Sequence, residues 1–126
     1  MKNVTRSILV VEDEKISSML LEHLLSELNY RVAGTASTGE EAIRQAACSR
    51  PDLIIMDVGL KGAMNGIEAA QIIHQQQQIP ILFLTAYMLE EISDRHDLPD
   101  GFGFLPKPVM LEELELTLKE LLGQVE

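Results

Sequence analysis

Five polar side chains lie at the ends of apolar segments, and their types suit the chemistry of phosphate. Asp57 closes one apolar segment, Glu12 and Asp13 follow a second, Thr85 follows a third and Lys107 a fourth. Phosphoryl transfer needs an in-line nucleophile and neutralisation of the three equatorial oxygens of the phosphoryl group. We predict that Asp57 is the nucleophile. Lys107, the hydroxyl of Thr85 and a divalent cation would each interact with one of those oxygens.

The acidic side chains predict that the cation is Mg²⁺. A carboxylate at the end of an apolar segment is costly unless a charged group meets it there. Glu12 and Asp13 beside Asp57 would repel one another without a cation. Mg²⁺ keeps several waters and takes one or two carboxylates together with a phosphate oxygen, so this set of ligands suits it.

Apolar segments alternate five times with segments of helical period. The five apolar segments, which we predict to be strands, cover residues 8–11, 31–36, 53–56, 79–84 and 102–105. Strands that alternate with helices indicate an α/β fold, with right-handed crossovers and a parallel sheet covered by helices on both faces. Ligands bind beyond the carboxyl ends of such strands, where the five polar side chains fall. No linker rich in Pro, Gly or Ser divides the chain, so we expect one (βα)5 domain over residues 1–126, with no output domain.

Helical periodicity and capping signals place the helices. One face of the first helix is marked by Ile16, Leu20, Leu24 and Leu28, and is widened by Met19, Leu21 and Leu25. Residues 38–41 form a capping box that opens the second helix. The third helix is expected from about 67 to 74, and the last helix carries leucines at spacings of three and four.

Composition limits the partners of the chain. The 126 residues include 20 acidic and 10 basic side chains, which give a net charge of −10. This charge argues against direct binding to nucleic acid or to an anionic membrane, because phosphate contacts need Lys and Arg. No apolar run approaches the roughly 20 residues of a membrane span. The single cysteine, Cys48, cannot form an internal disulfide, so we expect a soluble cytoplasmic protein.

Together these residues resemble the response-regulator receiver domain of two-component signalling, over nearly the whole chain. The matching segments are VVEDE at 10–14, LIIMD at 53–57, Thr85 with the alanine after it, and Lys107 with the proline after it. The spacing from the acid at 57 to Thr85 and Lys107 is typical of receivers. The resemblance implies a flavodoxin-like fold with a five-stranded parallel sheet in the order 2-1-3-4-5.

The resemblance also implies roles for the ligands of the cation. Asp13 is expected to bind Mg²⁺ directly, and Glu12 is expected to bind it through water. The backbone carbonyl of Gly59 resembles the family's main-chain metal ligand. Asp57 would complete the set and carry the phosphoryl group as an aspartyl phosphate.

A receiver is a signalling domain and not an enzyme that turns over a substrate. The implied donor is a histidine kinase or a histidine phosphotransfer protein, which passes a phosphoryl group from histidine to Asp57. The acyl phosphate would draw Thr85 inward, and Phe104 matches the aromatic switch residue that follows it. We expect the altered surface to bind a downstream protein or output domain, which the sequence does not identify.

Two segments depart from the common receiver pattern. Residues 59–66 lack the proline that is frequent in the family and form a loop one residue longer than usual, and Gly59 replaces a larger side chain. Residues 94–101 replace the usual end of the fourth helix. Since Pro99 and Gly101 stop a helix there, we predict a shortened or mobile fourth helix.

Two prolines restrict the fifth strand and the segment after it. Pro106 lacks an N–H and is tolerated only on an edge strand, which agrees with the inferred strand order. The resemblance further suggests a cis bond between Lys107 and Pro108, which we state as a hypothesis.

Two other functions fit parts of the pattern. A haloacid-dehalogenase-like phosphatase also uses an Asp nucleophile and Mg²⁺, but it needs a second Asp two positions later, where this chain has Gly59. An interaction module that is never phosphorylated would leave the five polar side chains unexplained. Labelling of the wild type but not of Asp57→Asn would exclude that module.

The chain is either a free-standing regulator or a receiver from a longer regulator or hybrid kinase.

Overall fold

A five-stranded parallel sheet forms the centre of the molecule, with its strands in the order β2-β1-β3-β4-β5. This computed structural model describes residues 5–86 and 101–123. The strands are β1 (Ser7–Val11), β2 (Arg31–Ala36), β3 (Leu53–Asp57), β4 (Ile81–Thr85) and β5 (Phe102–Pro106). The described helices are α1 (Lys15–Glu27), α2 (Gly39–Ser49), α3 (Gly66–Gln76) and α5 (Leu111–Leu121). The predicted flavodoxin-like order is therefore confirmed.

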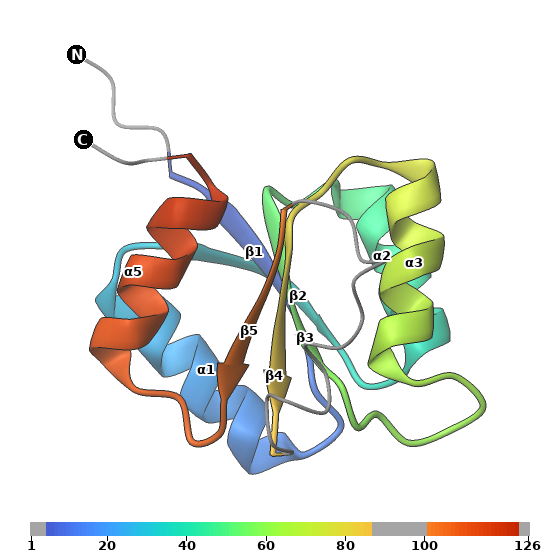
Figure 1. Ribbon diagram of the computed structural model, residues 1–126, viewed down its shortest axis with the longest axis horizontal. Helices are drawn as coiled ribbons and strands as arrows, with labels where there is room; N and C mark the ends of the chain where they lie inside the picture. Colours follow the sequence, from blue (N-terminus) through green and yellow to red (C-terminus); the bar gives the residue numbers. More distant parts are fainter. Residues whose placement is uncertain (1–4, 87–100, 124–126) are drawn as a thin grey trace.

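Helices cover both faces of the sheet. α1 and α5 lie on one face, and α2 and α3 lie on the other (Figure 1). The predicted fourth helix and its segment 94–101 lie almost wholly outside the described residues. Within residues 5–86 and 101–123, no helix combines the length and apolar character that crossing a bilayer requires.

The core consists of two apolar layers on the two faces of the sheet. Every residue of β1, β3 and β4 is buried, as expected for central parallel strands with helices on both faces. Alternate side chains of each strand point to opposite layers. Ile54 and Phe83 therefore pack toward α2 and α3, whereas Ile55 and Leu82 pack toward α1 and α5.

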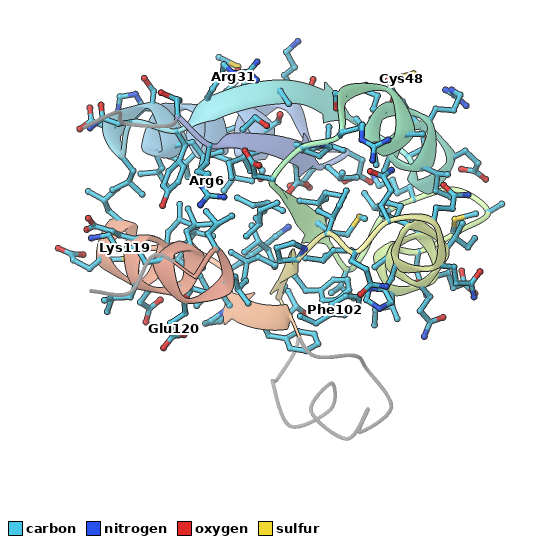
Figure 2. The ribbon with its side chains drawn as sticks, turned by 90° about the horizontal axis from the view of Figure 1, so that it is seen from above. Arg6, Arg31, Cys48, Phe102, Lys119 and Glu120 are labelled. Atoms are coloured by element: carbon cyan, nitrogen blue, oxygen red, sulfur yellow. The ribbon has the colours of Figure 1, made fainter. Side chains whose placement is uncertain are left out.

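The two edges of the sheet are formed by the strands that the sequence assigned to them. Arg31 of β2 and Phe102 of β5 mark opposite edges (Figure 2). β2 is the more polar edge, and Arg31 and Thr35 are exposed. Pro106 ends β5 opposite Thr85, so its missing N–H falls on an edge strand, as predicted.

The apolar face predicted for α1 is partly wrong. Ile16, Met19 and Leu20 are 83%, 57% and 48% exposed. Leu21 and Leu25, which also belong to the predicted face, are buried as expected, whereas the buried Ser18 was not predicted. Periodicity identified an apolar stripe, but part of that stripe faces away from the core.

The helix caps also differ from the prediction. The Thr38 side chain accepts a hydrogen bond from the Glu41 amide, as in a capping box. The Glu41 carboxylate, however, accepts from the amide of Ser37, one residue earlier than a reciprocal box requires. A complete capping box instead opens α3, between Asn65 and Glu68. α3 therefore begins at Gly66, directly after the loop that follows β3.

Candidate functional site

Three acidic side chains meet at the carboxyl edge of the sheet, where the strand arrows end together (Figure 1). Asp57 is the last residue of β3, and Glu12 and Asp13 follow β1, its neighbour in the sheet. One carboxylate oxygen from each of the three lies within 4.8 Å of the others. Glu12 and Asp57 are buried, and Asp13 is partly exposed. The parallel topology thus gathers residues that are distant in sequence.

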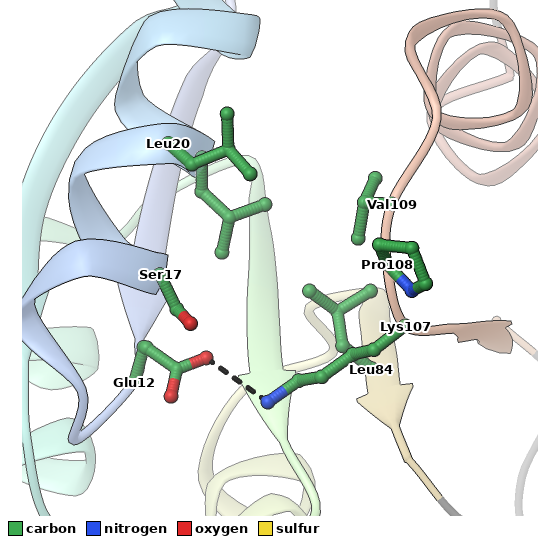
Figure 3. A pocket seen from close by; sticks show the side chains of 8 residues that line it. Glu12, Ser17, Leu20, Leu84, Lys107, Pro108 and Val109 are labelled. Atoms are coloured by element: carbon green, nitrogen blue, oxygen red, sulfur yellow. Dashed lines mark hydrogen bonds and ion pairs between the residues drawn. The ribbon is translucent and has the colours of Figure 1, made fainter.

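Lys107 is the cation that meets these acids from β5. Its Nζ lies 3.3 Å from Oδ1 of Asp57 and 3.4 Å from Oε1 of Glu12. Figure 3 shows the side chain reaching from the end of β5 to Glu12 beside α1. The backbone N–H of Lys107 donates to the carbonyl of Thr85, which fixes the start of the side chain. The peptide bond between Lys107 and Pro108 is cis, as hypothesised.

The charges of the site shift the pKa values of its members. The pKa of Glu12 is raised to about 7, first by burial and then by the negative charge of Asp57, and the charge of Lys107 opposes both effects. Burial alone would lower the pKa of Lys107, but the charges of Asp57 and Glu12 raise it above its ordinary value. One ammonium group therefore pairs with two carboxyl groups of a cluster of three, and negative groups outnumber positive ones at the site.

Thr85 and Phe104 lie on the two strands beside Asp57. Thr85 ends β4, is buried, and follows Leu84, which is the register partner of Asp57. Phe104 pairs with Phe83 across β4 and β5, and their rings stack with centroids 5.1 Å apart. The structure thus brings Thr85 to the same edge as Asp57 and places Phe104 against the core. The switch roles of both residues stay predictions.

The model of the protein family described as response regulator receiver domain matches residues 8–119 of this chain. The chain belongs to this family. The receiver domain is 35% identical over 111 residues to the transcriptional regulatory protein PdtaR of Mycobacterium tuberculosis. The aligned residues cover 88% of this chain and 54% of PdtaR. It is 38% identical over 125 residues to the alkaline phosphatase synthesis transcriptional regulatory protein PhoP of Bacillus subtilis, covering 98% of this chain and 51% of PhoP.

A solved structure supports the same assignment. The solution NMR structure of the Erythrobacter litoralis PhyR response regulator REC domain has a TM-score of 0.82 and 32% identity, covering 94% of this chain and 91% of that domain. The receiver domain spans about half the length of the curated relatives PdtaR and PhoP. The resemblance inferred from the sequence is therefore confirmed at the level of the family.

The acidic residues of this receiver domain fit a magnesium ion. Receiver domains typically bind Mg²⁺ at an acidic pocket. Here Glu12, Asp13 and Asp57 offer hard oxygen donors close together, and the negative charge of Asp57 adds to burial in raising the pKa of Glu12. The amide of Gly59 donates to Oδ1 of Asp57 at 3.1 Å, so this glycine adjoins the same carboxylate. Its carbonyl as a metal ligand stays a prediction.

An apolar cavity that the sequence did not predict borders the site. It has a volume of about 290 Å³ and lies between α1 and the segment after β5 (Figure 3). Leu20, Leu84, Pro108 and Val109 line it, with the Glu12–Lys107 pair at one end. The exposed side chain of Leu20, which periodicity assigned to the core, thus forms part of the rim.

The loop after β3 makes a second contact that the sequence did not predict. The backbone N–H of Lys61 donates to Oδ2 of Asp13 at 3.2 Å. Side-chain patterns carry no information about a main-chain donor. The absence of a proline from residues 59–66 is the one sequence signal, because every residue of the loop keeps its N–H.

Proposed function

We propose that this receiver domain is a phosphoacceptor switch that takes a phosphoryl group from a phosphohistidine onto Asp57. The observation that carries the proposal is the junction of Asp57 with Lys107 and with the acids Glu12 and Asp13. A nucleophile, a cation binder and a fixed ammonium group are the parts that phosphoryl transfer requires. The donor would be a histidine kinase or a histidine phosphotransfer protein.

Each group of the site has a part in the proposed transfer. A carboxylate oxygen of Asp57 forms a bond to phosphorus while the bond from phosphorus to the imidazole nitrogen breaks, and the electron pair of that bond leaves with the imidazole. Glu12, Asp13, Asp57 and the carbonyl of Gly59 would hold Mg²⁺, which neutralises charge on the phosphoryl oxygens when bound. Lys107 would stabilise a second oxygen, since it already contacts Oδ1 of Asp57.

The switch would act through Thr85 and Phe104. An acyl phosphate adds negative charge and acceptor oxygens at Asp57. The buried hydroxyl of Thr85, at the end of the neighbouring strand, could donate to one of these oxygens. Phe104 stacks on Phe83 of the same strand as Thr85, so a shift of β4 would reach its ring. The outcome is a changed surface for a downstream protein.

The exposed apolar residues of α1 support a protein donor. A phosphohistidine must reach Asp57, so its protein must contact the rim of the site. Ile16 and Leu20 on α1 and Met110 before α5 are 83%, 48% and 55% exposed, and Leu20 lines the cavity beside Lys107. Ile16 and Met110 directly precede and follow in sequence Ser17 and Val109, which line the same cavity, and exposed apolar groups around such a cavity are typical of protein interfaces. We assign this rim to the phosphodonor protein.

Two further features belong to the proposal. We propose that residues 1–126 form one receiver domain, since the described elements build one sheet. We also place the domain in the cytoplasm, because the lone Cys48 and the acidic composition suit that compartment.

Mass spectrometry tests the proposal directly. The intact wild type should gain the mass of one phosphoryl group after incubation with Mg²⁺ and acetyl phosphate, and Asp57→Asn should not. Chelation of the cation should prevent the gain. A wild type that stays unlabelled would count against the switch. Continuous turnover of a phosphoester would instead favour a phosphatase.

A further inference from the structure

The loop between β3 and α3 reaches back to the acidic site with its backbone. Lys61 N–H donates to Oδ2 of Asp13 at 3.2 Å, across 48 positions of sequence. The amide of Gly59 donates to Oδ1 of Asp57 at 3.1 Å. Two main-chain donors of one loop thus bind two of the three acids whose oxygens gather there.

This loop is anchored on both sides of Lys61. Leu60 is 6% exposed and belongs to the apolar layer under α2 and α3. Met64 is partly buried against the same layer, and its sulfur lies so close to Gly39 that a Cβ there would be 3.0 Å away. Gly62 turns the chain between these anchors with a φ of +107°, which favours glycine. The Lys61 amide is therefore held in place by packing, and does not depend on its exposed side chain.

We propose that the backbone N–H of Lys61 is a positioning group for the cation site, which holds Asp13 in the orientation that binds Mg²⁺. This inference rests on the proposed function, because it presumes that the acids bind the cation. The bond is made to Oδ2 of Asp13, so the second oxygen of this carboxylate is not engaged by it. Asp13 is the one partly exposed acid of the three, so its side chain has the most freedom to lose.

The physical reason is repulsion between like charges. Without a cation, Glu12 and Asp57 repel the Asp13 carboxylate, and the favoured response of an exposed side chain is to rotate toward water. A hydrogen bond from a fixed amide opposes this rotation before the ion arrives. Groups that orient a ligating carboxylate change metal affinity by about 10- to 100-fold when they are removed. The side chain of Lys61 plays no part, so its removal should have little effect.

A matched pair of substitutions tests the amide alone. Lys61→Ala removes the side chain and keeps the N–H, whereas Lys61→Pro removes both. Lys61 is not among the described residues with a positive φ, a backbone conformation that proline cannot adopt. We expect Lys61→Pro to bind Mg²⁺ about 10-fold more weakly than Lys61→Ala in calorimetric titrations of the intact chain. Equal affinities of the two variants would overturn the inference.

A second measurement does not depend on the folding of the proline variant. In the wild type without Mg²⁺, the Lys61 amide should exchange with solvent slowly for a loop, and Asp13→Ala should accelerate this exchange about 10-fold. Exchange that Asp13→Ala leaves unchanged would overturn the inference. If the wild type and Lys61→Ala both fail to bind Mg²⁺, the proposed cation site itself is wrong, and the exchange result still decides whether the amide holds Asp13.

Discussion

Nζ of Lys107 lies 3.3 Å from Oδ1 of Asp57, and this ion pair joins the ends of two strands that are not neighbours in the sheet. Its side chains are 26% and 9% exposed. The pair between Lys119 and Glu115 is almost as short, at 3.4 Å, but lies on one helix with exposures of 49% and 43%. Removing one partner of a buried pair leaves an uncompensated charge, whereas an exposed pair is worth little.

The two pairs therefore predict different costs for the same substitution. Lys107→Met should lower the free energy of unfolding by about 2 kcal/mol near neutral pH, because Glu12 and Asp57 then repel one another without compensation. Lys119→Met should change it by less than about 0.5 kcal/mol. Urea unfolding without Mg²⁺ measures both values. Equal losses would contradict the buried character of the Lys107 pair.

The raised pKa of Glu12 predicts that stability depends on pH. The pKa of Glu12 is about 7 in the folded state, compared with 4.5 for an ordinary glutamate, so the folded state binds the proton more tightly than the unfolded state. The stabilisation from protonation is therefore complete below about pH 4.5. It is lost as pH rises through about 7. At about 1.4 kcal/mol per pKa unit, a shift from 4.5 to about 7 corresponds to a loss of at most about 3.5 kcal/mol.

Unfolding by urea from about pH 5 to about pH 8, without Mg²⁺, should show this fall in stability. Glu12→Gln should remove most of it. The lowered pKa of Glu41 acts in the opposite direction and below the ordinary range of a carboxyl group, so it does not overlap this window. A fall that persists unchanged in Glu12→Gln would assign the effect to another group.

Two glycines, one just after β3 and one at the start of α3, predict opposite outcomes for one added methyl group. At Gly66 a Cβ would lie on the carbonyl oxygen of Asp57 and 2.9 Å from Cγ of Met56. At Gly59 the nearest atom would be Oδ1 of Asp57, at an ordinary 3.9 Å. We expect Gly66→Ala to destabilise the fold by about 3 kcal/mol, and Gly59→Ala by less than about 1 kcal/mol. Thermal unfolding followed by circular dichroism measures the stability of the two variants. Equal losses of stability would contradict the prediction and would mean that α3 can move away from β3 to accept the methyl group.

The sheet and the acids of the site could be predicted because both follow from short patterns. Central parallel strands appear as continuous apolar runs, and their carboxyl ends share one edge. Asp57 lies at the end of such a run, and the alternation of strands with helices indicates a parallel sheet. Glu12, Asp13 and Lys107, which follow other strands, could therefore be predicted as its spatial neighbours.

The face of α1 could not be predicted in the same way. Ile16 and Leu20 have the spacing of a core stripe, but periodicity does not distinguish the core from an exposed apolar rim. Ser18 is buried instead, and its hydroxyl donates to Glu22 one turn later. A small polar side chain that satisfies itself locally can occupy a core position.

Hydrogen bonds made by the backbone could not be predicted from residue patterns either. The Lys61 amide and the Asp13 carboxylate meet because Gly62 turns the loop between two packed anchors. The same holds for Glu41, whose carboxylate binds the amide of Ser37 and not the amide predicted by the capping pattern. Such contacts depend on the path of a loop, and that path follows from tertiary packing.

The exposed rim of α1 predicts a defect that a small donor does not reveal. Ile16 is 83% exposed beside the site, and Leu116 is 68% exposed on α5. Replacing either with Ser removes similar apolar area and should barely change stability, since neither side chain is in the core. If the rim binds the phosphodonor protein, Ile16→Ser should lower the labelling rate from a phosphorylated histidine protein about tenfold relative to the rate from acetyl phosphate.

Leu116→Ser is the matched control, and it should leave the ratio of the two labelling rates unchanged. The comparison uses a histidine kinase or phosphotransfer protein that labels the wild type. The ratio isolates docking from chemistry, because both donors use the same Asp57 and the same Lys107. A ratio that Ile16→Ser leaves at the wild-type value would mean that the donor does not contact this part of α1, and an equal fall in both variants would mean that the effect is not specific to the rim.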